Sequence, residues 1–169
     1  MKSTAIKKKK PVFPRLDGRD DDERVCAILE PEKPLPDDED EFCPPYATEE
    51  MLAKYRDFLV PRLAEGMALK GMEDGYCFSW EEGYTLGYGT EEVYASVRKN
   101  NCSAQDKVVF ISLLNEFNEG EGLLVEVERM SDKKIFLLPL CDFEARPKKS
   151  KEYQLLDDYS CWFVNSRCC

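Results

Sequence analysis

Two stretches of the chain carry apolar residues at helical spacing. Thr48 is a favourable N-cap, and the apolar residues after it recur every three or four positions, so they form one face of a helix. Ser150 can cap a second helix that carries Trp162 on its apolar stripe. These patterns predict a helical region over residues 48–71 and a C-terminal helix over residues 150–165.

Between these helices the apolar positions repeat every second residue or form short continuous runs, which is typical of β-strands. Runs of this kind occupy residues 76–80, 93–97, 107–114, 123–127 and 135–138. Ser131 and Asp132 make a tight turn between the last two runs, so Val127 and Ile135 are expected to flank a β-hairpin. Four or five short strands are too few for a sandwich. We therefore predict a small barrel over residues 90–145.

The first part of the chain differs from the rest in charge and in proline content. Residues 1–10 contain five lysines and no acid, residues 11–46 contain 12 acids and four bases, and seven of the ten prolines lie in this part. Such a segment cannot bury enough apolar surface to offset the entropy lost on ordering. We predict a mostly disordered charged arm over residues 1–46, with residues 24–29 as a short strand, and one globular domain over residues 47–169.

The composition argues against several classes of function. The formal net charge is -10, so we expect no binding to nucleic acid. The chain contains no histidine, which removes the commonest general base and the imidazole ligand of metal sites. No apolar run approaches the roughly 18 residues that span a bilayer, so no membrane association is expected. The eight cysteines lack the paired spacing of a zinc site, and we interpret them as reduced thiols of a cytoplasmic protein.

Carboxylates are the chemical groups that remain in quantity. A carboxylate-based hydrolase needs two of them across a cleft, one with a pKa raised by burial, and no spacing in the chain indicates such a pair. Calcium is a more economical use of these groups, because it accepts six to eight oxygen ligands in irregular geometry. We expect the loop carrying Asp142 and Glu144 to approach the C-terminal helix at Asp157 and Asp158, so that the four carboxylates converge on one calcium ion.

Four segments of the chain carry a resemblance to a known family. They are residues 106–109, 124–128, 135–144 and 156–162. In order and pattern they resemble the acidic calcium-binding protein family known from cyanobacteria, over roughly residues 90–165. The resemblance implies an SH3-like barrel core, a closing helix with an Asp-aromatic-x-x-Trp pattern, and calcium as the bound cofactor.

The expected fold class is α+β: a small SH3-like β-barrel with an N-terminal helical region and a closing C-terminal helix. The expected function is that of a non-enzymatic acidic binding protein whose ligand is calcium. Two alternatives stay open. One is a protein-interaction or accessory module that recognises a basic partner, and the other is the carboxylate-based hydrolase.

Overall fold

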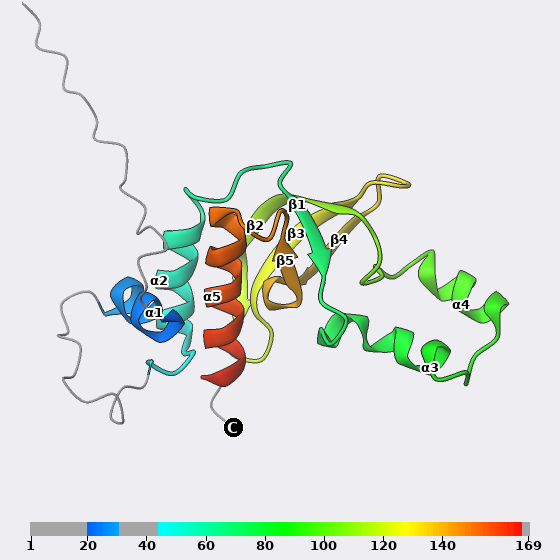
Figure 1. Cartoon of the computed structure of the whole chain (residues 1–169), viewed down its shortest axis with the longest axis horizontal. Helices are drawn as coiled ribbons and strands as arrows, with labels where there is room; N and C mark the ends of the chain where they lie inside the picture. The colour runs from blue at the N-terminus through cyan, green and yellow to red at the C-terminus, as the bar shows by residue number, and fades with distance from the viewer. Residues whose placement is uncertain (1–19, 31–43, 167–169) are drawn as a thin grey trace, which may run out of the picture.

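The fold is built on an open antiparallel sheet of five strands (Figure 1). The computed structural model describes residues 20–30 and 44–166. The strands are β1 (Ala68–Gly71), β2 (Val108–Asn118), β3 (Gly122–Arg129), β4 (Ile135–Pro139) and β5 (Phe143–Ala145). Their order across the sheet is β4-β3-β2-β1-β5, and every neighbouring pair is antiparallel. The fold class is α+β, as the sequence predicts.

The sheet is not closed into the SH3-like barrel predicted over residues 90–145. Closure would require β4 and β5 to pair, but these two strands lie at opposite edges. β5 pairs instead with β1, in the register Leu69 with Ala145 and Gly71 with Phe143. The sequence pattern assigns residues 68–71 to a helical region, so the strand that captures β5 is missing from the predicted barrel.

Three helices pack together beside the sheet. They are α1 (Asp21–Leu29), α2 (Glu49–Leu59) and α5 (Lys151–Asn165). The Trp162 side chain of α5 is buried, and its ring stacks on Tyr55 of α2 with centroids 5.2 Å apart. The hydroxyl of Tyr159 accepts a hydrogen bond from the amide of Leu123 at 2.7 Å, which ties α5 to the start of β3. The predicted C-terminal helix is confirmed, and its apolar stripe is part of the core.

The α1 helix occupies a segment for which the sequence pattern predicts a strand. Asp20 caps it by accepting a hydrogen bond from the amide of Glu23 at 2.8 Å, and acids fill its first turn, where the helix dipole favours negative charge. Val25 and Leu29 are buried four residues apart, which is a helical spacing. The strand prediction over residues 24–29 is wrong, because these residues lie in α1. A short apolar run fits a strand as well as a helix, so the sequence pattern did not distinguish the two. Residues 1–19 and 31–43 of the predicted arm lie outside the described residues.

The helical region predicted over residues 48–71 is shorter than expected. α2 starts after its N-cap Thr48, whose side chain accepts a hydrogen bond from Met51, and it ends at Leu59. Pro61 has no amide to continue the helical ladder, so the chain turns there and continues into β1.

The predicted β-hairpin is confirmed, whereas two other predicted strands are helical. β3 and β4 pair with Val127 opposite Phe136 and Glu128 opposite Ile135. Residues 76–80 lie in a 3-10 helix (Tyr76–Glu81), and residues 93–97 lie in α4 (Glu91–Arg98). A short α3 (Glu82–Thr85) lies between them. In the described part of the chain, no helix has the length and apolar character needed to cross a membrane.

Candidate binding site

Two of the four carboxylates expected to bind calcium lie after β4, Asp142 in a 3-10 helix (Leu140–Asp142) and Glu144 in β5. Asp142 is buried, and its Oδ2 accepts a hydrogen bond from the amide of Cys77 at 2.8 Å. Glu144, in β5, forms ion pairs with Arg146 and with Lys148, the latter at 3.1 Å. Both side chains therefore already have protein partners.

The other two carboxylates lie on α5 in different surroundings. Asp158 is buried and forms a two-point ion pair with Arg24 of α1. Burial raises the pKa of Asp158, although Arg24 opposes this by stabilising the charged form. Asp157 is exposed, and burial of part of its surface together with the nearby Asp158 and Asp21 raises its pKa.

These four residues do not form one ligand set in the structure. Within residues 20–30 and 44–166, no group of three or more acidic or cysteine side chains is arranged to hold a metal ion. Calcium binding stays a prediction from the sequence, and the geometry directs attention to another part of the molecule.

That part is the segment between β1 and β2, residues 72–107, which we call the excursion. α3 and α4 lie beyond the sheet, away from α1, α2 and α5 (Figure 1). Residues 79–101 include no buried side chain, so this region contributes little to the core. The excursion contains six aromatic residues, seven acids and three bases.

A groove of about 720 Å³ lies along the excursion. Its lining residues are Glu73, Phe78, Glu81, Glu82, Tyr84, Thr85, Leu86, Tyr94, Ala104 and Gln105. Three of these side chains are carboxylates, and the described lining includes no lysine or arginine. We call this hollow the acidic groove. Its aromatic and aliphatic walls sit beside a negative charge that no lining base offsets.

Glu81 joins two parts of the acidic groove through hydrogen bonds. Its Oε1 accepts a hydrogen bond from the hydroxyl of Tyr94 at 3.0 Å, and its Oε2 accepts one from the amide of Ala104 at 2.9 Å. Burial, and then this hydrogen bond to Glu81, raise the pKa of Tyr94. Both donors are neutral, so Glu81 links Tyr94 of α4 to Ala104 without forming an ion pair.

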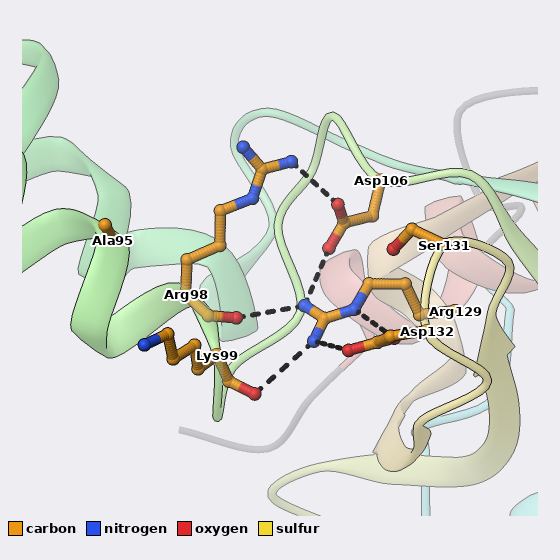
Figure 2. Close-up of a pocket in the computed structure, with 7 residues that line it drawn as sticks. All are labelled: Ala95, Arg98, Lys99, Asp106, Arg129, Ser131 and Asp132. Atoms are coloured by element: carbon orange, nitrogen blue, oxygen red, sulfur yellow. Dashed lines mark hydrogen bonds and ion pairs between the residues drawn. The ribbon is translucent and has the colours of Figure 1, made fainter.

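Arg129, at the end of β3, joins the excursion to the sheet (Figure 2). It donates two hydrogen bonds to the Asp132 carboxylate, at 2.9 and 2.8 Å. Its Nη1 also donates to the carbonyl oxygen of Arg98 at 3.0 Å and to Asp106 at 3.2 Å. The carbonyl of Arg98 belongs to the last turn of α4, where the helix leaves acceptors unsatisfied. One buried guanidinium therefore fixes the end of α4 against the β3–β4 hairpin.

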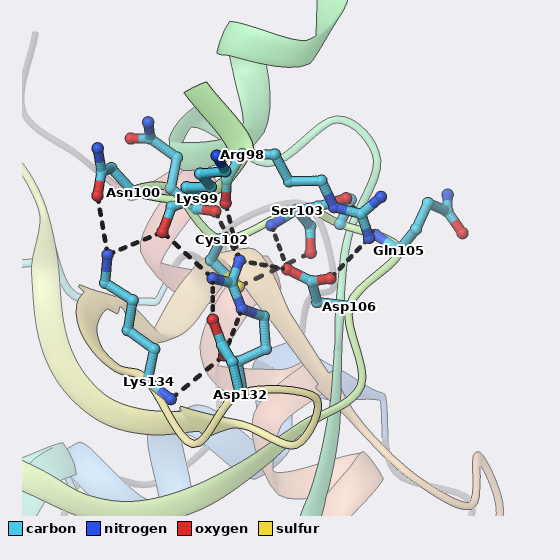
Figure 3. Close-up of polar contacts among 12 residues, drawn as sticks. Arg98, Lys99, Asn100, Cys102, Ser103, Gln105, Asp106, Asp132 and Lys134 are labelled. Atoms are coloured by element: carbon cyan, nitrogen blue, oxygen red, sulfur yellow. Dashed lines mark hydrogen bonds and ion pairs between the residues drawn. The ribbon is translucent and has the colours of Figure 1, made fainter. Parts of the chain in front are cut away.

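Further polar contacts surround this joint (Figure 3). Asp106 accepts hydrogen bonds from Arg98 at 2.9 Å and from the amide of Ser103 at 3.0 Å. Burial alone would raise the pKa of Asp106, but these bonds and the one from Arg129 lower it. Lys134 adds a hydrogen bond to Asn100 at 3.0 Å.

A hollow of about 300 Å³ lies at this joint. The guanidinium and carboxylate groups that line it are already paired with one another: Arg98 with Asp106, and Arg129 with Asp106 and Asp132. A ligand that binds to these guanidinium or carboxylate groups would have to break their pairs. We therefore interpret the joint as the support of the excursion, and the acidic groove as the candidate site.

The sequence pattern does not predict the acidic groove, because it assigns residues 76–80 and 93–97 to strands. A signal was nevertheless present. Aromatic and acidic residues are both frequent between positions 72 and 94, and an aromatic-rich segment without core periodicity is typical of an exposed contact surface.

Comparison of the chain with protein-family models, curated proteins and solved structures finds no match. The resemblance to the cyanobacterial calcium-binding family stays a prediction.

Proposed function

We propose that the protein is a non-enzymatic interaction module that recognises a basic partner protein through the acidic groove. The observation that carries this proposal is the combination, in one hollow of about 720 Å³, of three carboxylates with aromatic and aliphatic walls and without a lining base. Lysine and arginine side chains suit such a surface, because their charged heads pair with carboxylates while their methylene stems pack on apolar walls.

The individual glutamates support this reading. Glu82 and Glu73 are exposed, and Glu73 accepts a hydrogen bond from the amide nitrogen of Gln105 at 3.0 Å, a neutral donor. Glu81 likewise bonds to neutral donors. All three glutamates can therefore attract a cation without the loss of an ion pair within the protein.

The exposed apolar side chains of the excursion support a protein partner rather than a free ion. Tyr76 and Leu86 are exposed over 85% and 68% of their surfaces. Exposed apolar surface does not stabilise a monomer in water, and clusters of it are typical of contact sites. Covering such side chains is the main source of affinity in protein interfaces. A metal ion would leave them in water.

Binding of a short synthetic peptide of alternating lysine and glycine, measured by calorimetry at low and at high salt, tests the proposal. We expect binding that weakens as salt rises, because exposed charges are screened. The double change Glu73→Gln with Glu82→Gln should weaken it by about tenfold, while leaving Glu81 to hold the groove.

The matched control is Glu49→Gln with Glu116→Gln, which removes the same charge from exposed positions on α2 and β2. This control should bind the peptide within about twofold of the parent. Equal losses in the two double variants would mean that only the net charge attracts the peptide. That result, or the absence of binding by the parent protein, would contradict the proposal.

A further inference from the structure

A second, smaller hollow lies beside the acidic groove. It has a volume of about 160 Å³. Its lining residues are Trp80, Gly83, Tyr84, Tyr88, Gly89, Val93, Tyr94 and Val97. We call it the aromatic pocket. None of the described residues that line it carries a charge, which separates it chemically from the groove.

Two rings belong to both hollows. Tyr84 and Tyr94 line the groove and the pocket, and they stack on each other with centroids 4.1 Å apart and an angle of 18° between their planes. Trp80 continues the stack on Tyr94 at 5.5 Å. A peptide segment that lies in the groove can therefore place one of its neighbouring side chains in the pocket.

Two side chains that line the pocket are largely exposed to water. Tyr88 is exposed over 86% of its surface and Val93 over 58%. Neither belongs to the core, and Val93 lies on a helix that has no buried residue. An occupant that covers both side chains would remove this apolar surface from water.

We infer that the basic partner segment also carries a bulky apolar side chain that enters the aromatic pocket. This inference rests on the proposed function and specifies the partner: a segment with lysine or arginine in the groove and a leucine- or phenylalanine-like anchor beside them. A cavity of about 150 Å³ accepts a benzene ring, so the pocket can take one such side chain. Alternate side chains of an extended segment lie roughly 7 Å apart on one side, so anchor and base are expected about two to four residues apart.

The chemistry of the lining favours an apolar occupant over a second cation. Aromatic faces attract cations, but a desolvated cation also needs a counter-charge or hydrogen-bond acceptors. The described carboxylates of this region line the groove and not the pocket, and Val93 and Val97 add aliphatic surface. The acidic groove therefore suits a charged side chain, and the aromatic pocket suits an apolar one.

Three peptides of equal charge test the inference. The first carries leucine two residues from an arginine in a lysine-glycine background, the second carries alanine at that position, and the third carries the leucine at the far end, separated from the nearest base by an uncharged glycine-serine spacer that is much longer than the expected two to four residues. By calorimetry, the first should bind at least about tenfold more tightly than the second and third. All three should show the same salt dependence, since the anchor is uncharged.

Two variants locate the anchor. Gly83 lines the pocket and has no atom within 4 Å of the position of an added Cβ, so Gly83→Leu can fill the pocket without a clash at that atom. Val93→Ser removes apolar lining at an exposed position. Each should abolish the advantage of the leucine peptide and leave the affinity of the alanine peptide unchanged. Leu137→Ser, at another exposed apolar position, should preserve the advantage.

The outcomes separate the two proposals. The inference is overturned if the alanine peptide binds as tightly as the leucine peptide. It is also overturned if the leucine peptide keeps its higher affinity in both pocket variants. In either case the basic-partner function stands. If neither peptide binds, the proposed function fails, and the inference fails with it.

Discussion

Arg24 donates hydrogen bonds to both carboxylate oxygens of Asp158, from Nε at 2.8 Å and from Nη2 at 2.7 Å. These residues are 134 positions apart in the chain, and the pair joins α1 to α5. The Arg24 and Asp158 side chains are exposed over 15% and 4% of their surfaces. At this depth, loss of one partner leaves the other charge poorly solvated.

Arg24→Met should therefore lower the free energy of unfolding by about 3 kcal/mol, because Asp158 then loses the partner that offsets the cost of burying its carboxylate. Adding Asp158→Leu should restore part of the lost free energy of unfolding, because it removes the carboxylate that has lost its partner. Urea denaturation of the two single variants and of the double variant gives the coupling energy between the residues. Lys54→Ala, which removes an exposed ion pair with Glu50, is the control and should change stability by less than about 1 kcal/mol. Additive losses in the double variant would contradict the prediction.

Arg129→Met should loosen the excursion while leaving the sheet folded. The variant loses the bonds to the carbonyl of Arg98 and to the carboxylates of Asp106 and Asp132, and we expect a cost of about 3–5 kcal/mol. Hydrogen exchange should become faster for amides of α4 than for those of β3. Lys133→Met, which removes an exposed pair with Glu128, should leave both rates unchanged. Uniform acceleration over the whole chain would argue against a local joint.

Acid should weaken the same joint through Asp132. The hydrogen bonds from Arg129, in spite of some burial, lower the pKa of Asp132 to about 2 from an ordinary 3.8. Because the folded pKa is the lower of the two, the group's contribution to stability is present above about pH 4 and is lost as the pH falls through 2. Carboxyl carbon shifts followed by NMR should give the depressed pKa directly. Asp132→Asn should remove its share of the stability loss over this range, and an ordinary pKa in the parent would contradict the geometry.

Calcium should have little effect on the melting temperature. Asp158, Asp142 and Glu144 already pair with protein groups, so an ion would have to displace those partners. We expect thermal melts in calcium, magnesium and EGTA to coincide within about a degree. A calcium-specific rise of the order of 5–10 °C would favour the calcium function that the resemblance implies. Loss of that rise in Asp157→Asn, at an exposed position, would locate the ion on α5.

Part of the fold follows from patterns that are local in the chain. The N-caps Thr48 and Ser150 and the apolar stripe through Trp162 predict two helices, because a cap and a period need only neighbouring residues. The β3–β4 hairpin is predicted for the same reason. For α4, alternation of Val93 and Val97 with polar residues fits a strand, yet these two valines also lie four residues apart on one helical face. The cap at Thr90 decides between the two.

The site could be predicted less well, because it depends on distant pairs. Nothing near Asp158 in the sequence indicates that Arg24 pairs with its carboxylate, so the sequence alone leaves all four acids available for calcium. The prediction of a closed barrel is wrong for a similar reason. β5 pairs with the strand at Leu69, and the sequence pattern did not identify that strand. The groove glutamates are local to one segment, but their convergence depends on the contact of Glu81 with Ala104 across 23 positions.

The excursion leaves and rejoins the sheet at neighbouring points, since Leu69 of β1 lies opposite Val108 of β2. Between its two ends, residues 79–101 bury no side chain. Substitutions there are consequently less constrained by core packing, apart from positions such as Glu81 and Arg98 that hold the excursion in place. Under the proposed function, the chain separates the residues needed for folding from those that recognise a partner. If the acidic groove binds a partner as proposed, partner preference can diverge among descendants of this sequence, or be altered by grafting another segment between β1 and β2, while the scaffold stays the same.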